Sequence, residues 1–346
     1  MDPRSLIPAP DTIPVPWGWF DALLHVTFVA HILLMNAVVG GAAIALATHL
    51  RGSNTALAKD LSTKMPTALA LTINLGVAPL LFLQVLYGNF VYTSSVIMAA
   101  WWLSVIILVM AAYYGLYIYD FRFDSSGARP LLVAAPLALL VFVGFLFSNN
   151  MTLMLDPVRW TAWFDNRAGS LLNLGDPMLL PRWLHFMVAA LAVGGLAVAL
   201  LGRAKGDQEY VRTGLYWFTR ATLAQVVFGV WFLLSLPEPA LRQFLGGNAT
   251  SALLLAGALV LAAAALMSAF KGNVPGALLW TVLTVAGMAL VRDRLRGILL
   301  SPYQDIRTLA VTAEYSPMIL FLAVFLLAIP LVAWLVRQYL RSVKES

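Results

Sequence analysis

The chain contains nine apolar runs of about 20 residues, and this feature constrains its fold more than any other. An α-helix rises about 1.5 Å per residue, so each run is long enough to cross a hydrocarbon core of about 30 Å. We therefore predict an all-α polytopic membrane protein with nine transmembrane helices. The predicted spans lie near residues 22–49, 67–92, 97–119, 130–150, 183–202, 214–236, 251–270, 275–291 and 317–338.

The composition supports a membrane protein and excludes several other classes. Hydrophobic residues make up 61% of the 346 residues and charged residues 11%, whereas soluble proteins carry about 25% charged residues. The net charge is +6, but the basic residues are scattered among the predicted loops, so we expect no nucleic-acid partner. The chain has no cysteine, which excludes disulfides, iron–sulfur clusters and covalently attached c-type haem.

The sequence is internally duplicated. The segment HILLMNAVVGGAAIALA, which begins at His31, resembles HFMVAALAVGGLAVALL, which begins at His185. A second similarity links LGVAPLLFL, around Gly76, to FGVWFLLSL, around Gly229, and each lies about 45 residues after its histidine. Such a repeat predicts two related four-helix bundles, followed by a single C-terminal helix.

A histidine within a membrane span is costly to bury and usually has a function. Because His31 and His185 share one sequence setting, we interpret them as axial ligands of separate b-type haems; hydrogen-bonded or proton-carrying histidines are the alternative. One to three haems fit the sequence, and two is the expected number. Glycine pairs follow nine and ten residues later, and we expect a haem macrocycle to approach them, with contacts between helices as the alternative. These glycines are Gly40, Gly41, Gly194 and Gly195.

His25 and several arginines are further candidate cofactor-binding residues. His25 lies six residues before His31, about 120° away around a helix, so the two cannot ligate one iron. It is a candidate ligand of a third haem, a partner of His185, a propionate contact or an ordinary interfacial histidine. Guanidinium groups on the same side suit haem propionates, with lipid headgroups or a partner protein as the alternatives. These are Arg182, Arg292, Arg294 and Arg296.

The distribution of basic residues predicts the orientation of the chain. Twelve Lys and Arg residues lie on one side of the predicted spans and nine on the other. The first side is therefore expected to be cytoplasmic, with the N-terminus outside and His31 and His185 near the periplasmic face of a bacterial-type inner membrane. The predicted segments are a Pro-rich outer arm at 1–21, a first four-helix bundle at 22–150, an outer loop at 151–182, a second four-helix bundle at 183–291, an outer loop at 292–316, and a ninth helix with a cytoplasmic tail at 317–346.

At these residues the chain resembles subunit I of the cytochrome bd quinol oxidase family. The stretch INLGVAPLLFLQVLYGNFVYTSS, from Ile73 to Ser95, is similar to the second helix of that family. PRWLHFMVAALAVGG, with Arg182 and His185, resembles the approach to the axial histidine of the family's low-spin haem. The segment after His31 resembles the helix that carries the histidine ligand of a high-spin haem. The resemblance covers most of the chain and implies nine helices, haem b and quinone.

The chain departs from the family at positions that serve oxygen. Two glutamates on the family's third helix correspond here to Ala100 and Leu108, and a glutamate on its eighth helix corresponds to Val285. The methionine ligand of the low-spin haem corresponds to Leu253, and the loop that shapes the quinol site is reduced to about residues 236–250. Oxygen reduction needs an open iron position and a proton route, so these departures imply that oxygen chemistry has been lost.

The sequence therefore predicts a haem b subunit of a respiratory complex that moves electrons between membrane quinone and an outer-side redox subunit. The expected partners are other subunits of a membrane redox complex, with an outer-side multihaem cytochrome c foremost, together with lipid and quinone. Two alternatives stay open: a membrane transporter without haem, and a true bd-type terminal oxidase subunit. Duplicated bundles also occur in transporters, although repeats of one orientation fit that alternative less well.

Overall fold

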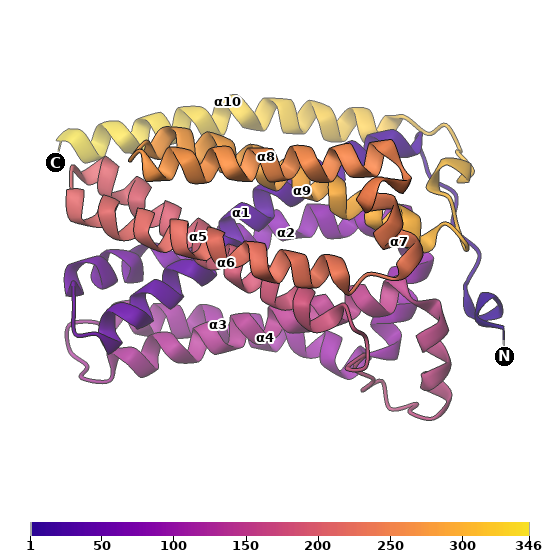
Figure 1. Ribbon diagram of the computed structural model, residues 1–346. Helices are drawn as coiled ribbons and strands as arrows, with labels where there is room; N and C mark the ends of the chain where they lie inside the picture. The colour runs from indigo at the N-terminus through magenta and orange to yellow at the C-terminus, as the bar shows by residue number, and fades with distance from the viewer. Residues whose placement is uncertain (1, 346) are drawn as a thin grey trace.

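The computed structural model describes residues 2–345 as an assembly of long helices that run roughly along one direction (Figure 1). The first half of the chain forms α1 (Trp17–Leu50), α2 (Thr55–Ile97), α3 (Ala99–Phe121) and α4 (Arg129–Leu155). The second half forms α5 (Leu179–Lys205), α6 (Gln208–Leu234), α8 (Ala249–Phe270), α9 (Val274–Leu300) and α10 (Ser316–Glu345). The connections contain η1 (Pro3–Leu6), η2 (Pro157–Phe164), α7 (Glu238–Arg242), η3 (Gln243–Gly247) and η4 (Ile306–Thr308).

Eight of these helices, α1 to α6, α8 and α9, are long and apolar enough to cross a membrane. They coincide with the first eight predicted apolar runs, so the prediction of an all-α polytopic membrane protein is confirmed. The ninth run lies in α10, whose described apolar segment is Ser316–Ala328. The crossing of the membrane by α10, and with it the total of nine spans, stays a prediction.

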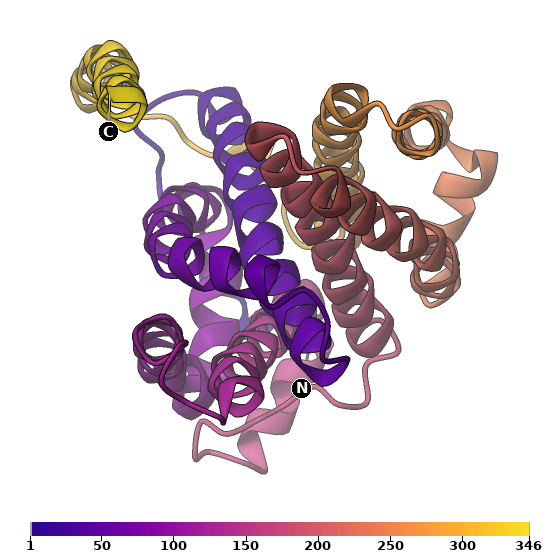
Figure 2. The ribbon, with the colours of Figure 1, turned by 90° about the vertical axis from the view of Figure 1, so that its left-hand side faces the viewer.

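The helices form two groups that meet along α1 (Figure 2). Helices α1 to α4 pack together in the first group, and α5, α6, α8 and α9 pack together in the second. Helix α1 also packs against α5 and α9 of the second group. Helix α10 lies at the outside, where Phe321 contacts Phe82 of α2 with their ring centroids 6.3 Å apart. The contacts therefore place four of the eight long apolar helices in each group.

The two ends of the assembly differ in their connections (Figure 1). One end, called here the loop-rich end, holds the N-terminus, η2, α7 and the segment before α10. The other, called the short-turn end, holds the short connections that follow α1, α3, α5 and α8. Three of these connections end in capping side chains that accept hydrogen bonds from the first turn of the next helix, which sets where α2, α6 and α9 begin. These caps are Asn54, Asp207 and Asn273.

Several helices extend further than the predicted spans. Helix α5 begins at Leu179 and α9 continues to Leu300, so Arg182 and Arg292 lie within helices instead of the predicted outer loops. The predicted spans end near these arginines because hydropathy measures how favourably a residue is transferred into lipid, and a charged residue scores as unfavourable. Both arginines instead lie against aromatic rings inside the protein, so the helices continue through them.

The last part of the N-terminal arm is docked into the fold. Ile13 and Val15 are buried. The backbone N–H of Ile13 donates to the carbonyl of Ala310 at 2.9 Å, and the N–H of Thr312 donates to the carbonyl of Ile13 at 3.0 Å. These bonds tie the arm to the segment before α10, because a buried backbone needs hydrogen-bond partners.

Candidate functional site

His31 lies on α1 and faces α2. Its Nδ1 donates to the carbonyl oxygen of Thr72 at 3.0 Å. Because a carbonyl only accepts, the neutral ring carries its proton on Nδ1 and keeps a lone pair on Nε2. Gly76, one turn further along α2, lies against the ring: a Cβ there would be 2.7 Å from the Cε1 atom of His31. The imidazole is therefore held in one orientation, and its Nε2 makes no hydrogen bond to a described residue.

His185 lies on α5 and faces α6 in a corresponding way. A Cβ on Gly229 of α6 would be 3.3 Å from the Cε1 atom of His185. The Nδ1 atom of His185 is enclosed and has no hydrogen-bond partner in the described part of the chain. Gly76 and Gly229 are the glycines of the second sequence similarity. The duplicated segments thus form two like contacts between a histidine and a glycine, one in each helix group.

A further polar atom near His185 has no hydrogen-bond partner. Gln225 lies on α6 one turn before Gly229, and its Oε1 is enclosed and unpartnered within the described residues. A buried polar group without a partner costs about 1–3 kcal/mol. The face of α5 and α6 around His185 therefore offers two polar atoms that a bound ligand can satisfy.

The residues around both histidines fit b-type haem. Haem iron is ligated by a neutral imidazole, and the other ring nitrogen of such a ligand usually donates to a carbonyl or carboxylate. His31 has this arrangement through Thr72. The absence of cysteine means that any haem here is held without thioether bonds. The two histidines face different partner helices, α2 and α6.

The glycine pairs that follow the histidines lie at contacts between helices, which corrects the prediction that they face a cofactor. Gly40 of α1 and Gly194 of α5 face each other, and a Cβ on Gly194 would be 2.6 Å from the Cα of Gly40. Gly195 packs against α6 and Gly41 against α2. A separation of nine residues turns a helix by about 180°, so the first glycine of each pair points away from its histidine.

His25, a candidate ligand of a third haem, lies in an ionic cluster at the loop-rich end. Its Nδ1 is 2.7 Å from the backbone oxygen of Asp21, one turn earlier on α1. Asp21, His25 and Asp293 of α9 each place one oxygen or nitrogen within 4.8 Å of the others. Arg296 donates to Asp293 at 2.7 Å and balances one of the two carboxylates. The Nδ1 side of His25 thus faces charged groups of α1 and α9, whereas its Nε2 is enclosed and has no hydrogen-bond partner in the described part of the chain, so its role as a ligand stays a prediction.

Arg182 and Arg292 each lie about one helical turn from one of the two histidine sites. The guanidinium of Arg292 lies 4.2 Å from the ring centroid of Phe28, three residues before His31. Arg182 precedes His185 by three residues and lies 5.3 Å from the ring centroid of Phe232, which follows Gly229 on α6. Neither arginine forms an ion pair with a described carboxylate. Each site therefore has a nearby guanidinium that is free to bind an anionic group.

Arg294 has a different position from these two arginines. Its Nε donates to the hydroxyl of Ser251 at 3.0 Å, and its Nη2 donates to Gln243 at 3.4 Å. These bonds join α9 to the beginning of α8 and to η3. Arg294 thus helps to hold the second helix group together, and its contact with a haem propionate stays a prediction.

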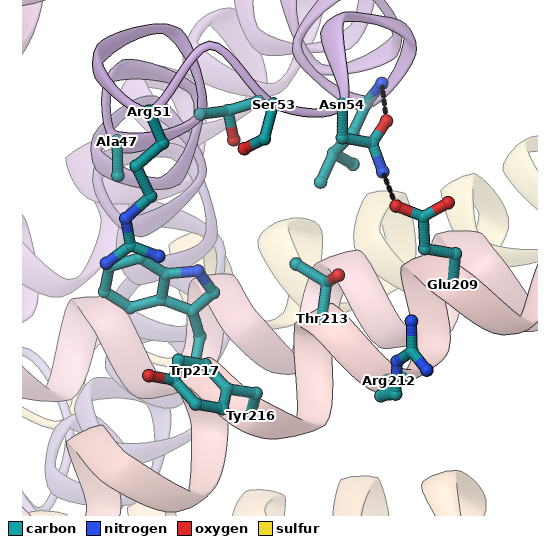
Figure 3. A pocket seen from close by; sticks show the side chains of 11 residues that line it. Ala47, Arg51, Ser53, Asn54, Glu209, Arg212, Thr213, Tyr216 and Trp217 are labelled. Atoms are coloured by element: carbon teal, nitrogen blue, oxygen red, sulfur yellow. Dashed lines mark hydrogen bonds between the residues drawn. The ribbon is translucent and has the colours of Figure 1, made fainter.

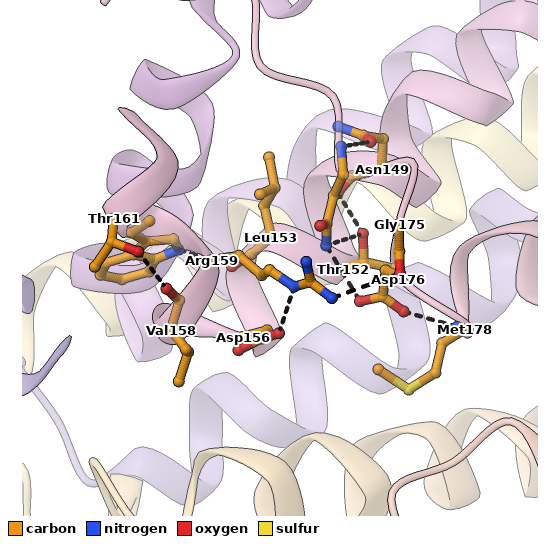
Figure 4. A network of polar contacts seen from close by, with 12 residues as sticks. Asn149, Thr152, Leu153, Asp156, Val158, Arg159, Thr161, Gly175, Asp176 and Met178 are labelled. Atoms are coloured by element: carbon orange, nitrogen blue, oxygen red, sulfur yellow. Dashed lines mark hydrogen bonds and ion pairs between the residues drawn. The ribbon is translucent and has the colours of Figure 1, made fainter. Parts of the chain in front are cut away.

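A polar network at the loop-rich end fixes the beginning of α5 (Figure 4). Asn149 accepts a hydrogen bond from the backbone N–H of Asn173 at 2.7 Å, and the side chain of Asn173 donates to Asp176 at 3.1 Å. Asp176 also accepts from the N–H of Met178 at 2.7 Å. Burial raises the pKa of the Asp176 carboxyl, while the Met178 N–H and the charge of Arg182 act in the opposite direction. This network positions the turn that carries Arg182.

Among solved structures, the chain is similar to a chain of the bd oxidase from Geobacillus thermodenitrificans. The TM-score is 0.61 and the sequence identity is 15%, and the match covers 96% of each chain. A likeness at this identity shows the fold, so the protein has a bd-oxidase-like fold. No family model and no curated protein matches the chain.

The structure locates the four positions at which the sequence resemblance predicts departures from the bd oxidase family. Ala100 and Leu108 lie on α3 and Val285 on α9, and neither helix contains a glutamate. Leu253, predicted from the sequence resemblance to stand at the position of a methionine ligand, lies on α8 with 72% of its surface exposed. A side chain that points outward to this extent faces lipid or a partner subunit instead of the histidine sites.

Proposed function

We infer that this protein is a haem b-binding subunit of a membrane redox complex, which passes electrons between membrane quinone and an outer-side cytochrome c or another redox subunit. The observation that carries the proposal is the repeated contact between histidine and glycine, His31 with Gly76 and His185 with Gly229. Two histidines of like setting, each with an uncommitted nitrogen, suit the axial ligation of two haems. The bd-oxidase-like fold supports the same class of protein.

Individual residues would divide the work of holding two haems. His31 and His185 would ligate iron, and the carbonyl of Thr72 would keep the ring of His31 in its orientation. Arg292 and Arg182 would bind propionates, because a guanidinium donates paired hydrogen bonds to a carboxylate. Bound haem b would supply one-electron oxidation and reduction. The surrounding apolar helices would exclude water and tune the reduction potential.

Electron transfer demands less of this chain than oxygen reduction does. Oxygen reduction needs protons carried into the membrane, usually by buried carboxylates. Helices α3 and α9 contain no glutamate at the positions where the related family has them, and Ala100, Leu108 and Val285 cannot carry protons. We therefore place the chain in a larger complex, with an outer-side multihaem cytochrome c as the foremost partner.

Absorption spectra of the purified complex test the proposal and its main alternatives. We expect a Soret band, reduced b-type α-bands, little binding of carbon monoxide and no rapid quinol-driven oxygen uptake. A protein without a Soret band would support the haem-free transporter. Stoichiometric carbon monoxide binding together with rapid oxygen uptake would support the terminal oxidase, a candidate that the fold of the bd oxidase chain favours.

The proposed orientation places the loop-rich end in the periplasm of a bacterial-type inner membrane. Ala168 lies in an exposed position at this end, and Ser125 lies in an exposed position at the short-turn end. In a chain without cysteine, Ala168→Cys should react with an impermeant thiol reagent on intact cells, whereas Ser125→Cys should react only after lysis. The opposite pattern would reverse the topology and place both histidine sites near the cytoplasm.

A further inference from the structure

A pocket lies at the short-turn end, beside the turn between α1 and α2. Figure 3 shows its lining residues. It has a volume of about 310 Å³ and is bounded by the end of α1, the turn to α2 and the first half of α6. The residues that give it its chemistry are Arg51, Asn54, Glu209, Arg212, Tyr216 and Trp217. The pocket thus lies between the two helix groups, where no proposed haem residue is found.

The charged groups of this pocket carry one net positive charge. Arg51 extends over Trp217, with its guanidinium 5.5 Å from the ring centroid (Figure 3). Neither Arg51 nor Arg212 forms an ion pair with a described carboxylate. Glu209 accepts a hydrogen bond at 3.0 Å from the side chain of Asn54, and this bond spans the mouth of the pocket. Two arginines and one glutamate match a ligand that has one negative charge and hydroxyl groups.

The surroundings of the pocket are those of a membrane interface. Trp217 and Tyr216 are amphipathic aromatic side chains of the type that gathers at the level of lipid headgroups. Below Tyr216, one face of α6 exposes apolar side chains at Leu223, Val227 and Val230. The helix rises about 21 Å from Tyr216 to Val230, which exceeds half of a hydrocarbon core of about 30 Å. An acyl chain can therefore extend along α6 from a headgroup in the pocket.

We propose that this pocket binds an anionic phospholipid of the phosphatidylglycerol type. Its phosphodiester lies between Arg51 and Arg212, where guanidinium groups donate charge-assisted hydrogen bonds. Its glycerol hydroxyls donate to Glu209, and its acyl chains cover α6. The lipid then bridges the turn between α1 and α2 and the beginning of α6, in addition to the direct bond between Asn54 and Glu209.

Lipid binding by the purified protein tests this proposal. The protein is delipidated in detergent and titrated with phosphatidylglycerol or phosphatidylethanolamine, and bound lipid is measured by native mass spectrometry. We expect wild-type protein to retain one phosphatidylglycerol in preference to phosphatidylethanolamine. The double variant Arg51→Gln/Arg212→Gln should bind phosphatidylglycerol at least about tenfold more weakly than the wild type, because both phosphate donors are lost. Glu209→Gln keeps an acceptor for Asn54 but removes a negative charge, so it should bind phosphatidylglycerol more tightly.

The control variant is Arg203→Gln, which removes an exposed arginine of α5 at the same end but outside the pocket. It should bind phosphatidylglycerol as the wild type does. The proposal would be overturned if Arg203→Gln lost as much lipid binding as the double variant, or if the double variant bound phosphatidylglycerol as the wild type does. Displacement of the lipid by millimolar inorganic phosphate would also overturn it. Haem content, measured on the same samples, is expected to stay constant, so failure of the lipid site is distinguishable from failure of the proposed redox function.

Discussion

Replacing His31 with alanine is expected to remove about half of the haem from the purified protein, and replacing His185 should remove the other half. The reason is that the two histidines face different helices, so each ligates its own haem. The double variant should contain no haem. Membrane insertion should be unchanged, because alanine is compatible with a membrane-spanning helix and the apolar runs stay intact.

The measurement is haem per protein, from the pyridine haemochrome spectrum and an independent protein assay. His49→Ala is the matched control, since His49 also lies on α1 but at the short-turn end, where its Nε2 lies 2.8 Å from the hydroxyl of Tyr119. This variant should keep its full haem content. Unchanged haem and unchanged reduced spectra in both His31→Ala and His185→Ala would refute the assignment of ligands.

Substitution at Gly76 separates ligation from support of the ligand. A leucine at this position would meet the ring of His31, since even its Cβ would be 2.7 Å from Cε1. If the contact between His31 and Gly76 defines the first site, Gly76→Leu should therefore reduce haem content as His31→Ala does. The second site should keep its haem.

The long helices were predictable from sequence because length and apolarity alone determine them. Their ends were harder to predict, since a charged residue ends an apolar run without ending the helix. Arg292 shows why: it lies in α9 against Phe28, a residue of α1 that is distant in sequence. The pairing that allows the charge to be buried is a property of the tertiary structure, and no local pattern contains it.

The candidate site was predictable in part for the same reason. The repeat identified His31 and His185 as a pair, and the similarity around Gly76 and Gly229 marked the residues that lie against them. The sequence similarity did not show that each glycine contacts its histidine, because the two residues lie on different helices. The position of His25 could not be predicted either, since Asp293 lies at the other end of the chain and approaches it only in the fold.

The role of the glycine pairs could have been predicted from helix geometry. A residue is rotated by about 100° relative to the one before it, so Gly40 and Gly194 lie opposite His31 and His185 on their helices. A glycine opposite the candidate ligand faces another helix instead of the haem. The close approach of α1 and α5 at these glycines is therefore the structural consequence of the first sequence repeat.

Gly194→Leu should consequently have a large effect on the contact between α1 and α5. A Cβ at this position already lies 2.6 Å from the Cα of Gly40, and a backbone atom cannot rotate away as a side chain can. Even Gly194→Ala should destabilise the protein by about 1–3 kcal/mol, since overpacking forces the backbone to shift. The leucine should separate the two helices and prevent a stable assembly of the two groups.

The control is Gly257→Leu on α8, where nothing lies within 4 Å of an added Cβ. Thermal unfolding in detergent and gel filtration measure the effect. Gly257→Leu should be at least as stable as the wild type, because leucine has a higher helix propensity than glycine. A melting temperature of Gly194→Leu within about 2 °C of the control would contradict the close contact of α1 with α5.

Because α1 carries His31 and α5 carries His185, moving these helices apart should also disturb both histidine sites. Haem should therefore be lost from both sites in Gly194→Leu, whereas each histidine variant empties one.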